Sequence, residues 1–327
     1  MDPIVSVILP VYNCPHYVGE AIQSILDQSF ADFELIVIDD GSTDETPNVL
    51  RRFADARIRW TVQENRGLPA TLNRGIELAR GRYIARQDQD DISLPERFRK
   101  QVAYLDAHPV CALVGTWAEI WRERTKTDRT HRHPPENSTL KFELLFNNPF
   151  VHSSVMLRKT ALDRLGGYCT DGTRQPPEDY ELWSRIAREY EVGNVPEILH
   201  VYREVGGSMS RAGPSPFLDH LVILCAENIA WAARTDSTSP DVTNLAALAH
   251  GAEHRLTVRP NFDAMREILR RAVAQVAVED DRVRLERDAE KRINNLRHRY
   301  WDLRQEHSLP GQVLRLARNI VAGLWRR

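Results

Sequence analysis

The chain has 327 residues, 42% of them hydrophobic and 28% charged, a balance typical of globular proteins that excludes a disordered or membrane-embedded chain. The length exceeds what one ordinary core needs, so we expect a large domain with an appended region. The net charge of −2 hides an asymmetry. The segment 282–327 carries twelve Lys and Arg against five Asp and Glu, a net +7 that leaves −9 for the rest.

The cysteines and the N-terminus indicate the cellular compartment. The four cysteines are far apart and form no CxxC pair, so neither a zinc site nor a disulfide framework is expected. The first residues enter a strand pattern without a basic segment or a long apolar stretch, so no signal peptide is predicted. No apolar run approaches the length of a transmembrane helix. We therefore expect a cytoplasmic protein.

Apolar runs alternate with helical patterns through the first hundred residues. Strands are predicted at 4–9, 33–38, 58–62 and 82–85, and helices at 17–28, 44–53 and 67–79. This alternation predicts an α/β fold with a doubly wound, mostly parallel sheet. The sequence contains neither GxGxxG after the first strand nor GxxxxGK[ST] anywhere, so the dinucleotide and P-loop fingerprints are missing.

The pattern changes along the remainder of the chain. Strands are predicted at 110–115, 116–121, 152–157 and 199–203, helices at 95–107, 140–146 and 178–190, and a polar loop at 123–137. Further helices are predicted at 217–234, 242–255, 262–278 and 280–306. We expect a domain at 1–212, with halves 1–115 and 116–212, followed by a helical region at 213–327.

Three carboxylates, Asp88, Asp90 and Asp91, follow the predicted strand at 82–85 within four positions. In an open α/β sheet, ligands bind at the carboxyl ends of the strands. Carboxylates this close repel one another, and a hard divalent cation such as Mg²⁺ or Mn²⁺ would relieve that repulsion. The alternative is a solvated acidic turn that favours the dipole of the following helix.

Five motifs occur in a fixed order along the chain. They are SVILPVYN at 6–13, VIDDGSTD at 37–44, NRG at 65–67 and again at 73–75, DQDD at 88–91, and the pair Glu178-Asp179. Together they resemble the family 2 glycosyltransferases, which have the GT-A fold. The resemblance covers roughly residues 3–210 and leaves the helical C-terminal third outside it.

The resemblance implies an inverting, divalent-metal-dependent transferase that uses a nucleotide sugar. Its donor-binding positions are matched by Pro10, Tyr12, Asp39, Asp40 and Asp88. Tyr12 matches the residue that packs on the base, and Asp40 the one that accepts the imide N–H of uracil or thymine. Asp39 is expected to orient the loop, and Asp88 to meet the ribose or the sugar.

Further roles are implied for the metal and the acceptor. Asp90 matches the metal ligand, with Mn²⁺ or Mg²⁺ expected, whereas the role of the adjacent Asp91 stays open. Asp179 matches the catalytic base. Glu178 could serve instead, and Asp179 could be only a helix N-terminal charge. Trp183 lies one turn further on and is expected to line the acceptor pocket.

The chemistry of glycosyl transfer also calls for these residue types, independently of the resemblance. An attacking hydroxyl must lose its proton as the new bond forms, which needs one positioned carboxylate. Direct displacement then inverts the anomeric centre, and no second carboxylate is needed as a nucleophile.

Several histidines are candidates for metal ligands or for residues of the acceptor site. His152 is expected either near the acceptor site or as a structural residue. His131 and His133 have the spacing of a metal pair but lie in a polar stretch, so surface residues are the better interpretation. His250 and His254 share a predicted helix face, where packing is the simpler explanation.

The basic C-terminal segment offers two kinds of partner. An amphipathic helix at 310–327 with Arg on one face can lie on an anionic membrane, next to a lipid-linked or glycan acceptor. The alternative is a helix that packs on this chain or in a homo-oligomer. No nucleic-acid partner is expected, because acidic residues interrupt the basic stretch and no known module is present.

Two other functions were compared with the transferase. A non-catalytic nucleotide-sugar or glycan-binding protein of the same fold would not need Asp179. A nucleotidyltransferase usually carries a glycine-rich, basic loop after its first strand, where this chain has Pro10-Val11-Tyr12-Asn13.

Overall fold

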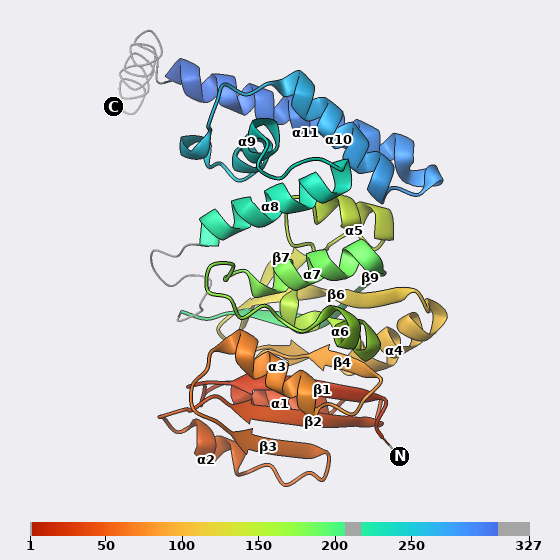
Figure 1. Cartoon of the computed structure of the whole chain (residues 1–327). Coiled ribbons are helices and arrows are strands. Elements are labelled where there is room, and N and C mark those ends of the chain that lie inside the picture. The colour runs from red at the N-terminus through yellow and green to blue at the C-terminus, as the bar shows by residue number, and fades with distance from the viewer. Residues whose placement is uncertain (1, 207–216, 307–327) are drawn as a thin grey trace, which may run out of the picture. The chain divides into compact units, whose positions relative to one another are not determined.

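The computed structural model describes residues 2–206 and 217–306 (Figure 1). The chain divides into two compact units, Met1–Leu221 and Val222–Arg327, and the division falls within helix α8 (Phe217–Ala233). Unit 1 is built on one continuous sheet, and the described part of unit 2 is helical. Among the described residues, no helix is both long and apolar enough to cross a membrane.

The first half of unit 1 is the predicted parallel sheet. Its strands run in the order β3-β2-β1-β4, and their bounds are β1 (Val5–Val11), β2 (Phe33–Asp39), β3 (Ile58–Val62) and β4 (Tyr83–Arg86). Every residue of β1, β2 and β4 is buried, which explains why these strands are apolar runs rather than alternating patterns. The helices between them are α1 (Val18–Leu26), α2 (Thr46–Leu50) and α3 (Leu68–Leu78).

The sheet continues beyond β4 as a mixed sheet. The order goes on as β4-β8-β6-β9-β5, and β7 pairs with the outer part of β6. The bounds are β5 (Ile92–Ser93), β6 (Cys111–Arg122), β7 (Thr125–His131), β8 (Met156–Arg158) and β9 (Glu191–Glu204). The pairs β4–β8, β8–β6 and β9–β5 are antiparallel, whereas β6 and β9 are parallel. The expected boundary at 115/116 falls inside β6.

Three local predictions in this half were wrong. The stretches 110–115 and 116–121 form one strand, β6, with shifts of register on either side of Trp117 rather than a break. The predicted loop at 123–137 contains β7, a mostly exposed edge strand that lacks the apolar alternation of a half-buried strand. The predicted strand at 152–157 begins as a 3₁₀ helix, η1 (His152–Ser154), because Ser154 turns back to bond the carbonyl of Val151.

Four more helices complete unit 1: α4 (Arg97–Ala107), α5 (Asn137–Glu143), α6 (Lys159–Leu165) and α7 (Glu178–Glu189). Helix α7 presents an apolar face that includes Leu182, Trp183 and Ile186 to the interior. The same helix begins with three acidic residues in its first turn, where they favour the helix dipole. Burial of one face thus fixes where those carboxylates lie.

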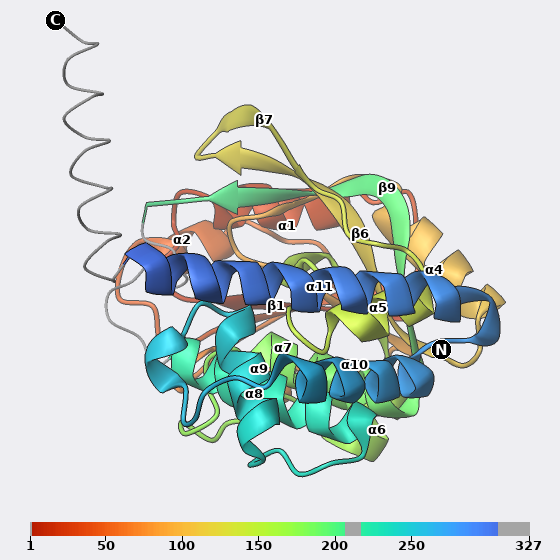
Figure 2. The ribbon, with the colours of Figure 1, turned by 90° about the horizontal axis from the view of Figure 1, so that it is seen from above.

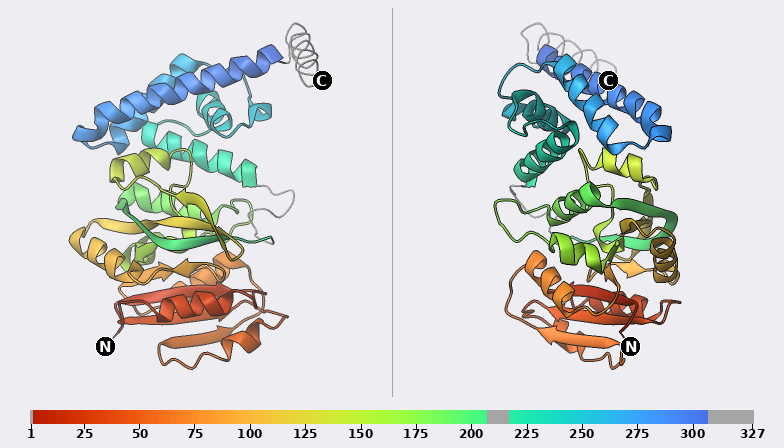
Figure 3. Two further views of the ribbon diagram at one scale, coloured as in Figure 1. Left: turned by 180° about the vertical axis from the view of Figure 1, so that it is seen from behind. Right: turned by 45° about the vertical axis from the view of Figure 1, so that its right-hand side comes forward.

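Unit 2 contains α9 (Pro240–Ala249), η3 (Glu253–Arg255), α10 (Phe262–Val276) and α11 (Glu279–Glu306). Helices α10 and α11 lie side by side (Figures 2 and 3). Helix α11 was predicted to carry a thin apolar stripe at Leu285, Ile293, Leu296, Tyr300 and Leu303. The first four of these side chains are buried, and Leu303 is half-buried. The predicted amphipathic helix at 310–327 lies outside the described residues.

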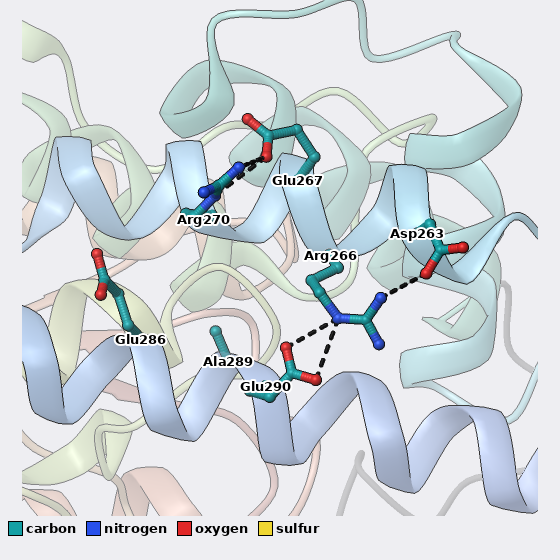
Figure 4. Close-up of a pocket in the computed structure, with 7 residues that line it drawn as sticks. All are labelled: Asp263, Arg266, Glu267, Arg270, Glu286, Ala289 and Glu290. Atoms are coloured by element: carbon teal, nitrogen blue, oxygen red, sulfur yellow. Dashed lines mark hydrogen bonds and ion pairs between the residues drawn. The ribbon is translucent and has the colours of Figure 1, made fainter.

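A pocket of about 460 Å³ lies between α10 and α11 (Figure 4). Its charged side chains pair with one another: Arg266 with Glu290 and Asp263, and Arg270 with Glu267. The pocket is therefore lined by ion pairs, of which Arg266–Glu290 joins the two helices and the other two lie within α10.

Candidate active site

The polar residues that follow β1, β2 and β4 meet at one edge of the sheet. The three strands are neighbours in the order β2-β1-β4, and Val11 is in register with Asp39. The loop at Tyr12, the Asp39-Asp40 pair and the acidic turn at 88–91 therefore lie together, where ligands bind in open α/β sheets. Figure 1 shows these strand ends on the same side of the unit.

Asp40 fastens the loop between β3 and α3. Its Oδ1 accepts hydrogen bonds from the backbone N–H of Arg66 at 2.9 Å and from Nε2 of Gln63 at 2.6 Å, and its Oδ2 accepts from the N–H of Gly67 at 2.9 Å. Gly67 has φ of +81°, a conformation that favours glycine and lets its N–H turn towards the carboxylate. Asp40 thus holds the loop that leads into α3, while Asp39, which was expected to orient a loop, binds the N–H of Ser42 in the loop after β2.

One carboxylate oxygen of Asp39 has no hydrogen-bond donor among the described residues. Its Oδ1 accepts from the N–H of Ser42 at 2.8 Å, whereas its Oδ2 is buried and has no hydrogen-bond partner among the described residues. A buried carboxylate oxygen without a donor is costly. The N–H of a bound base is one group that would satisfy it. Both carboxylates therefore stay candidates for base recognition.

Gln89 joins the acidic turn to the loop after β1. The N–H of Tyr12 donates to its Oε1 at 2.7 Å, and its Nε2 donates to the carbonyl of Tyr12 at 3.2 Å. Tyr12 is 44% exposed as a residue, whereas Pro10 is buried inside β1. Sequence reasoning passed over Gln89, because a polar residue between two aspartates carries no distinguishing signal.

Arg97 holds the acidic turn by hydrogen bonds to residues on either side of it. Its buried guanidinium donates through Nη2 to the carbonyls of Arg86 and Val155, and through Nη1 to Gln87 and Ser93. Burial, followed by the charge of Arg86, lowers the pKa of Arg97 to about 9. The sequence analysis did not identify Arg97, although an arginine on the same helix face as Phe98, Val102 and Leu105 was a usable signal.

The three aspartates of the turn have different surroundings. Asp88 forms an ion pair with Arg86. Burial and the charges of Asp91 and Asp88 raise the pKa of Asp90 to about 8. These shifts arise because carboxylates are held close together in a partly desolvated place.

Asp91 is a structural link rather than an open ligand. Its side chain is 2% exposed and accepts hydrogen bonds from the hydroxyl of Ser153, from the N–H of Arg203 at 2.7 Å and from Nε2 of His200 at 3.2 Å. Burial and Asp88 raise its pKa to about 7. Asp91 therefore ties the turn to η1 and β9.

The turn has the donor chemistry for a hard divalent cation. Asp88 and Asp90 offer carboxylate oxygens, and their mutual repulsion is what such a cation would relieve. Within 2–206 and 217–306, no group of three or more His, Cys, Asp and Glu is arranged to hold a metal ion. A cation held here would therefore take most of its ligands from water and from substrate phosphates, as Mg²⁺ commonly does.

Asp179 is held at the start of α7 by two neutral donors. Its Oδ2 accepts from Nδ2 of Asn148 at 2.6 Å, and its Oδ1 from the N–H of Tyr180 at 2.7 Å. Burial and the charge of Glu178 raise the pKa of Asp179 to about 7, and burial also raises the pKa of Glu178. A carboxylate with a pKa near neutrality is suited to general base catalysis. Asn148 is a site residue that the sequence did not reveal.

His152 completes this cluster. Its Nδ1 lies 3.8 Å from Oε1 of Glu178 and 4.0 Å from Oδ2 of Asp179, and its Nε2 lies 3.0 Å from the hydroxyl of Tyr168. Burial and the charge of Arg86 hold the pKa of His152 well below its usual value. The imidazole is therefore neutral at physiological pH and can only donate or accept hydrogen bonds there.

Trp183 does not line an open pocket, contrary to expectation. Its side chain is 0% exposed, and its ring meets those of His152 at 5.7 Å, Tyr168 at 6.1 Å and Phe150 at 6.5 Å between centroids. Trp183 lies on the apolar face of α7, and its ring packs against that of His152.

The acidic turn and the α7 cluster lie within electrostatic range of each other. The charge of Asp88 raises the pKa of Glu178, and that of Arg86 lowers it. The structure thus brings together the strand-end aspartates and the Glu178-Asp179 pair, which are far apart in sequence.

The other histidines lie elsewhere. The rings of His131 and His133 stack at 5.7 Å near the end of β7, and His131 also meets the ring of Tyr202. Burial lowers the pKa of His133 to about 4. In unit 2, His254 lies in η3, and His250 follows α9.

Known proteins share this sequence and fold. A model described as glycosyl transferase family 2 matches residues 6–166. The chain is 36% identical over 228 residues to "Putative glycosyltransferase EpsE" of Bacillus subtilis, covering 68% of this chain and 81% of that protein. It is 34% identical over 189 residues to the O-antigen biosynthesis glycosyltransferase WbnJ of Escherichia coli, covering 57% and 72%. It is 32% identical over 200 residues to the amylovoran biosynthesis glycosyltransferase AmsE of Erwinia amylovora, covering 59% and 74%.

Solved structures have the same architecture. TarS of S. aureus (its residues 1–349), in complex with UDP-GlcNAc, has a TM-score of 0.62 at 19% identity and covers 94% of this chain and 93% of its own. The mannosyltransferase PcManGT from Pyrobaculum calidifontis, in complex with GDP-Man and Mn²⁺, has a TM-score of 0.52 at 22% identity and covers 89% and 80%. At these identities the likeness establishes the fold.

Proposed function

This chain belongs to glycosyl transferase family 2 and is a glycosyltransferase of GT-A fold. On that premise we propose that it inverts the configuration at the anomeric carbon of the sugar it transfers. The sugar moves from a nucleotide sugar to a hydroxyl group of a glycan or lipid-linked acceptor. The observation that carries this proposal is Asp179, a buried carboxylate that Asn148 orients and whose pKa is raised to about 7.

A pyrimidine donor, UDP- or dTDP-linked, fits the nucleotide end best. Uracil and thymine present an imide N–H, and the Asp39-Asp40 pair supplies acceptors at the end of β2, one of them the free Oδ2 of Asp39. The exposed ring of Tyr12 offers the base a stacking surface. The UDP-GlcNAc complex of TarS, which has the same fold, supports this choice.

Mn²⁺ or Mg²⁺ would be held by Asp90, with Asp88 beside it for the ribose or the sugar. When bound, the cation supplies charge stabilisation to the departing diphosphate. The Gln89 bridge to Tyr12 holds the metal-binding turn and the base-stacking loop at one separation, so both ends of the donor are positioned together.

Asp179 takes the proton from the attacking hydroxyl in the transfer step. The hydroxyl oxygen forms its bond to the anomeric carbon while the bond from that carbon to the diphosphate oxygen breaks, and the electron pair leaves with the nucleotide. His152, which is neutral, and Asn148 keep the carboxylate aimed without supplying charge. One displacement inverts the anomeric configuration.

The acceptor is proposed to be a surface polysaccharide or its lipid-linked precursor, by analogy with the names of WbnJ and AmsE. A cytoplasmic location, contact of 310–327 with a membrane and pairing of the C-terminal helices between copies stay predictions. They can be tested by cell fractionation, vesicle flotation and sedimentation respectively.

The decisive experiment is a panel of UDP-, dTDP- and GDP-sugars incubated with Mn²⁺ and the wild type, Asp90→Ala or Asp179→Asn. Slow cleavage of one donor by the wild type, lost in both variants, supports the transferase. If donors bind but are not cleaved, even with glycan and lipid extracts as acceptors, the alternative of a non-catalytic nucleotide-sugar-binding protein replaces it.

A further inference from the structure

His152 lies between a tyrosine hydroxyl and two carboxyl groups. Its Nε2 lies 3.0 Å from the hydroxyl of Tyr168, and its Nδ1 lies 3.8 Å from Oε1 of Glu178 and 4.0 Å from Oδ2 of Asp179. The imidazole is neutral, because burial holds its pKa well below the usual value. A neutral imidazole carries one N–H, so the groups around it decide which nitrogen holds the proton.

Both kinds of neighbour favour the proton on Nδ1 of His152. An ionised carboxylate only accepts hydrogen bonds, so a bare Nδ1 would set its lone pair against the oxygens of Glu178 and Asp179. The hydroxyl of Tyr168 keeps its own proton, because burial raises its pKa, and it lies within hydrogen-bond distance of Nε2 as a donor. A bare Nε2 and a protonated Nδ1 therefore satisfy the hydroxyl and the carboxylates together.

Tyr168 is held in place from α3. Asn73, in the second NRG motif, accepts from the N–H of Tyr168 through Oδ1 at 2.7 Å and donates to the carbonyl of Tyr168 through Nδ2 at 2.8 Å. A Cβ at Gly167 would collide with this Oδ1, so the two segments are in close contact there. Tyr168 is buried, and its ring meets that of Trp183 at 6.1 Å between centroids. The backbone and the ring of Tyr168 are both fixed, which keeps the hydroxyl at Nε2 of His152.

We propose that Tyr168 and His152 are positioning residues for the catalytic base. The hydroxyl of Tyr168 donates to Nε2 of His152, and the imidazole presents Nδ1–H to the Glu178-Asp179 pair. In this tautomer Nδ1 has no free lone pair, so the proton of the attacking hydroxyl goes to Asp179 and not to His152. The N–H dipole also stabilises the ionised form of the carboxylate pair. The catalytic meaning of this arrangement rests on the proposed function, whereas the tautomer can be measured without turnover.

The tautomer of the wild type is the first measurement. The full chain, with ¹⁵N in its histidine rings and without metal or substrate, is studied by ¹H–¹⁵N correlation NMR at neutral pH. Because the chain has 11 histidines, the His152 signals are assigned by their loss in His152→Asn. We expect a protonated Nδ1 and a bare Nε2. A protonated Nε2, alone or together with a protonated Nδ1, overturns the proposal, and this result requires no variant of Tyr168 to fold.

Tyr168→Phe tests the donor to His152. The variant keeps the ring but removes the hydroxyl, so the ¹⁵N signal of Nε2 should move to the position of a nitrogen without a hydrogen bond, while Nδ1 stays protonated. Tyr83→Phe is the matched control, since Tyr83 is also buried and its hydroxyl donates to Oδ1 of Asp106 at 2.6 Å. The control should leave the His152 signals unchanged. An unmoved Nε2 signal in folded Tyr168→Phe overturns the proposed hydrogen bond.

Activity tests the positioning role. The amide nitrogen of Asn lies as many bonds from Cα as Nδ1 of His, and that of Gln as many as Nε2. His152→Asn should therefore keep a donor towards Asp179 that His152→Gln loses, and its kcat for nucleotide release from the donor that the wild type cleaves should be about fivefold higher. Equal kcat values in the two variants overturn the positioning role. If Asp179→Asn is active, the proposed function fails at its base while the measured tautomer stands, so the two failures are distinguishable.

Discussion

Two pairs of neighbouring carboxylates, one in the turn after β4 and one at the start of α7, are buried in different ways. In the turn, Asp91 accepts hydrogen bonds from three uncharged protein donors, while Asp90 remains among like charges and its pKa is raised to about 8. At α7, Asp179 is held by the amide of Asn148 and the N–H of Tyr180. Asp90 would be ionised at neutral pH only beside an additional positive charge, whereas Asp179, with a pKa of about 7, can gain and lose a proton near neutral pH.

Of the substitutions in the two carboxylate pairs, Asp179→Asn should lower activity the most. The amide keeps the shape but cannot accept the proton, so we expect a loss of kcat of about 1,000-fold with donor binding retained. Because the pKa of Asp179 is raised from its ordinary value to about 7 in the folded state, the wild type loses stability as the pH rises towards 7, and the loss is complete above it. The variant should therefore raise Tm more at pH 8 than at pH 5. Glu178→Gln is the matched control, and a larger loss there would move the base to Glu178.

Removing the cation should have the next largest effect. Asp90→Ala or treatment with EDTA should lower kcat by about 100-fold, because the diphosphate then leaves without compensation of its charge. Calorimetry of Mn²⁺ binding in the presence of UDP is the direct measurement. Full activity in EDTA would show that protein groups alone stabilise the leaving group.

Asn148→Ala tests how the base is held. Without the amide donor the ionised form of Asp179 loses a hydrogen bond, so its pKa rises and the acid limb of the pH-rate profile moves to higher pH. We expect a loss of about tenfold at pH 7 that shrinks at pH 9. An equal loss at both pH values would make Asn148 a packing residue.

Asp39→Asn and Asp40→Asn separate loop stabilisation from base recognition at the end of β2. Asp40→Asn exchanges a charged acceptor of three donors for a neutral amide and should lower the free energy of unfolding by about 2 kcal/mol. Asp39→Asn should leave stability nearly unchanged and weaken UDP binding about tenfold. The reverse pattern, measured by denaturant unfolding and UDP titration, would return base recognition to Asp40 alone.

Gln89→Ala should have the smallest effect. It removes two hydrogen bonds to the Tyr12 backbone at the surface, which are worth about 1 kcal/mol together. We expect KM for the donor to rise about fivefold with kcat unchanged. Gln23→Ala on α1, whose amide bonds only Asp27 among the described residues, is a control for loss of a surface amide.

Much of the fold followed from local patterns. The four parallel strands and their helices were predicted from their sequence patterns. Three of the strands, β1, β2 and β4, are buried and therefore read as apolar runs bounded by turns. The wrong assignments fell on segments that lack such a run. The polar edge strand β7 carries almost no apolar residues. At η1, the hydroxyl of Ser154 turns back to the carbonyl of Val151, which a strand pattern does not reveal.

The sequence by itself determined which residues end the strands, because motif order and strand position put Tyr12, Asp39, Asp40 and Asp88 at one edge of a parallel sheet. Only the tertiary structure decided what each side chain does there. The donors that engage Asp40 and Asp91 come from residues 23 to 112 positions away, and the burial of Trp183 depends on which face of α7 meets the core. Partners this distant leave no local pattern, since they arise from packing between elements.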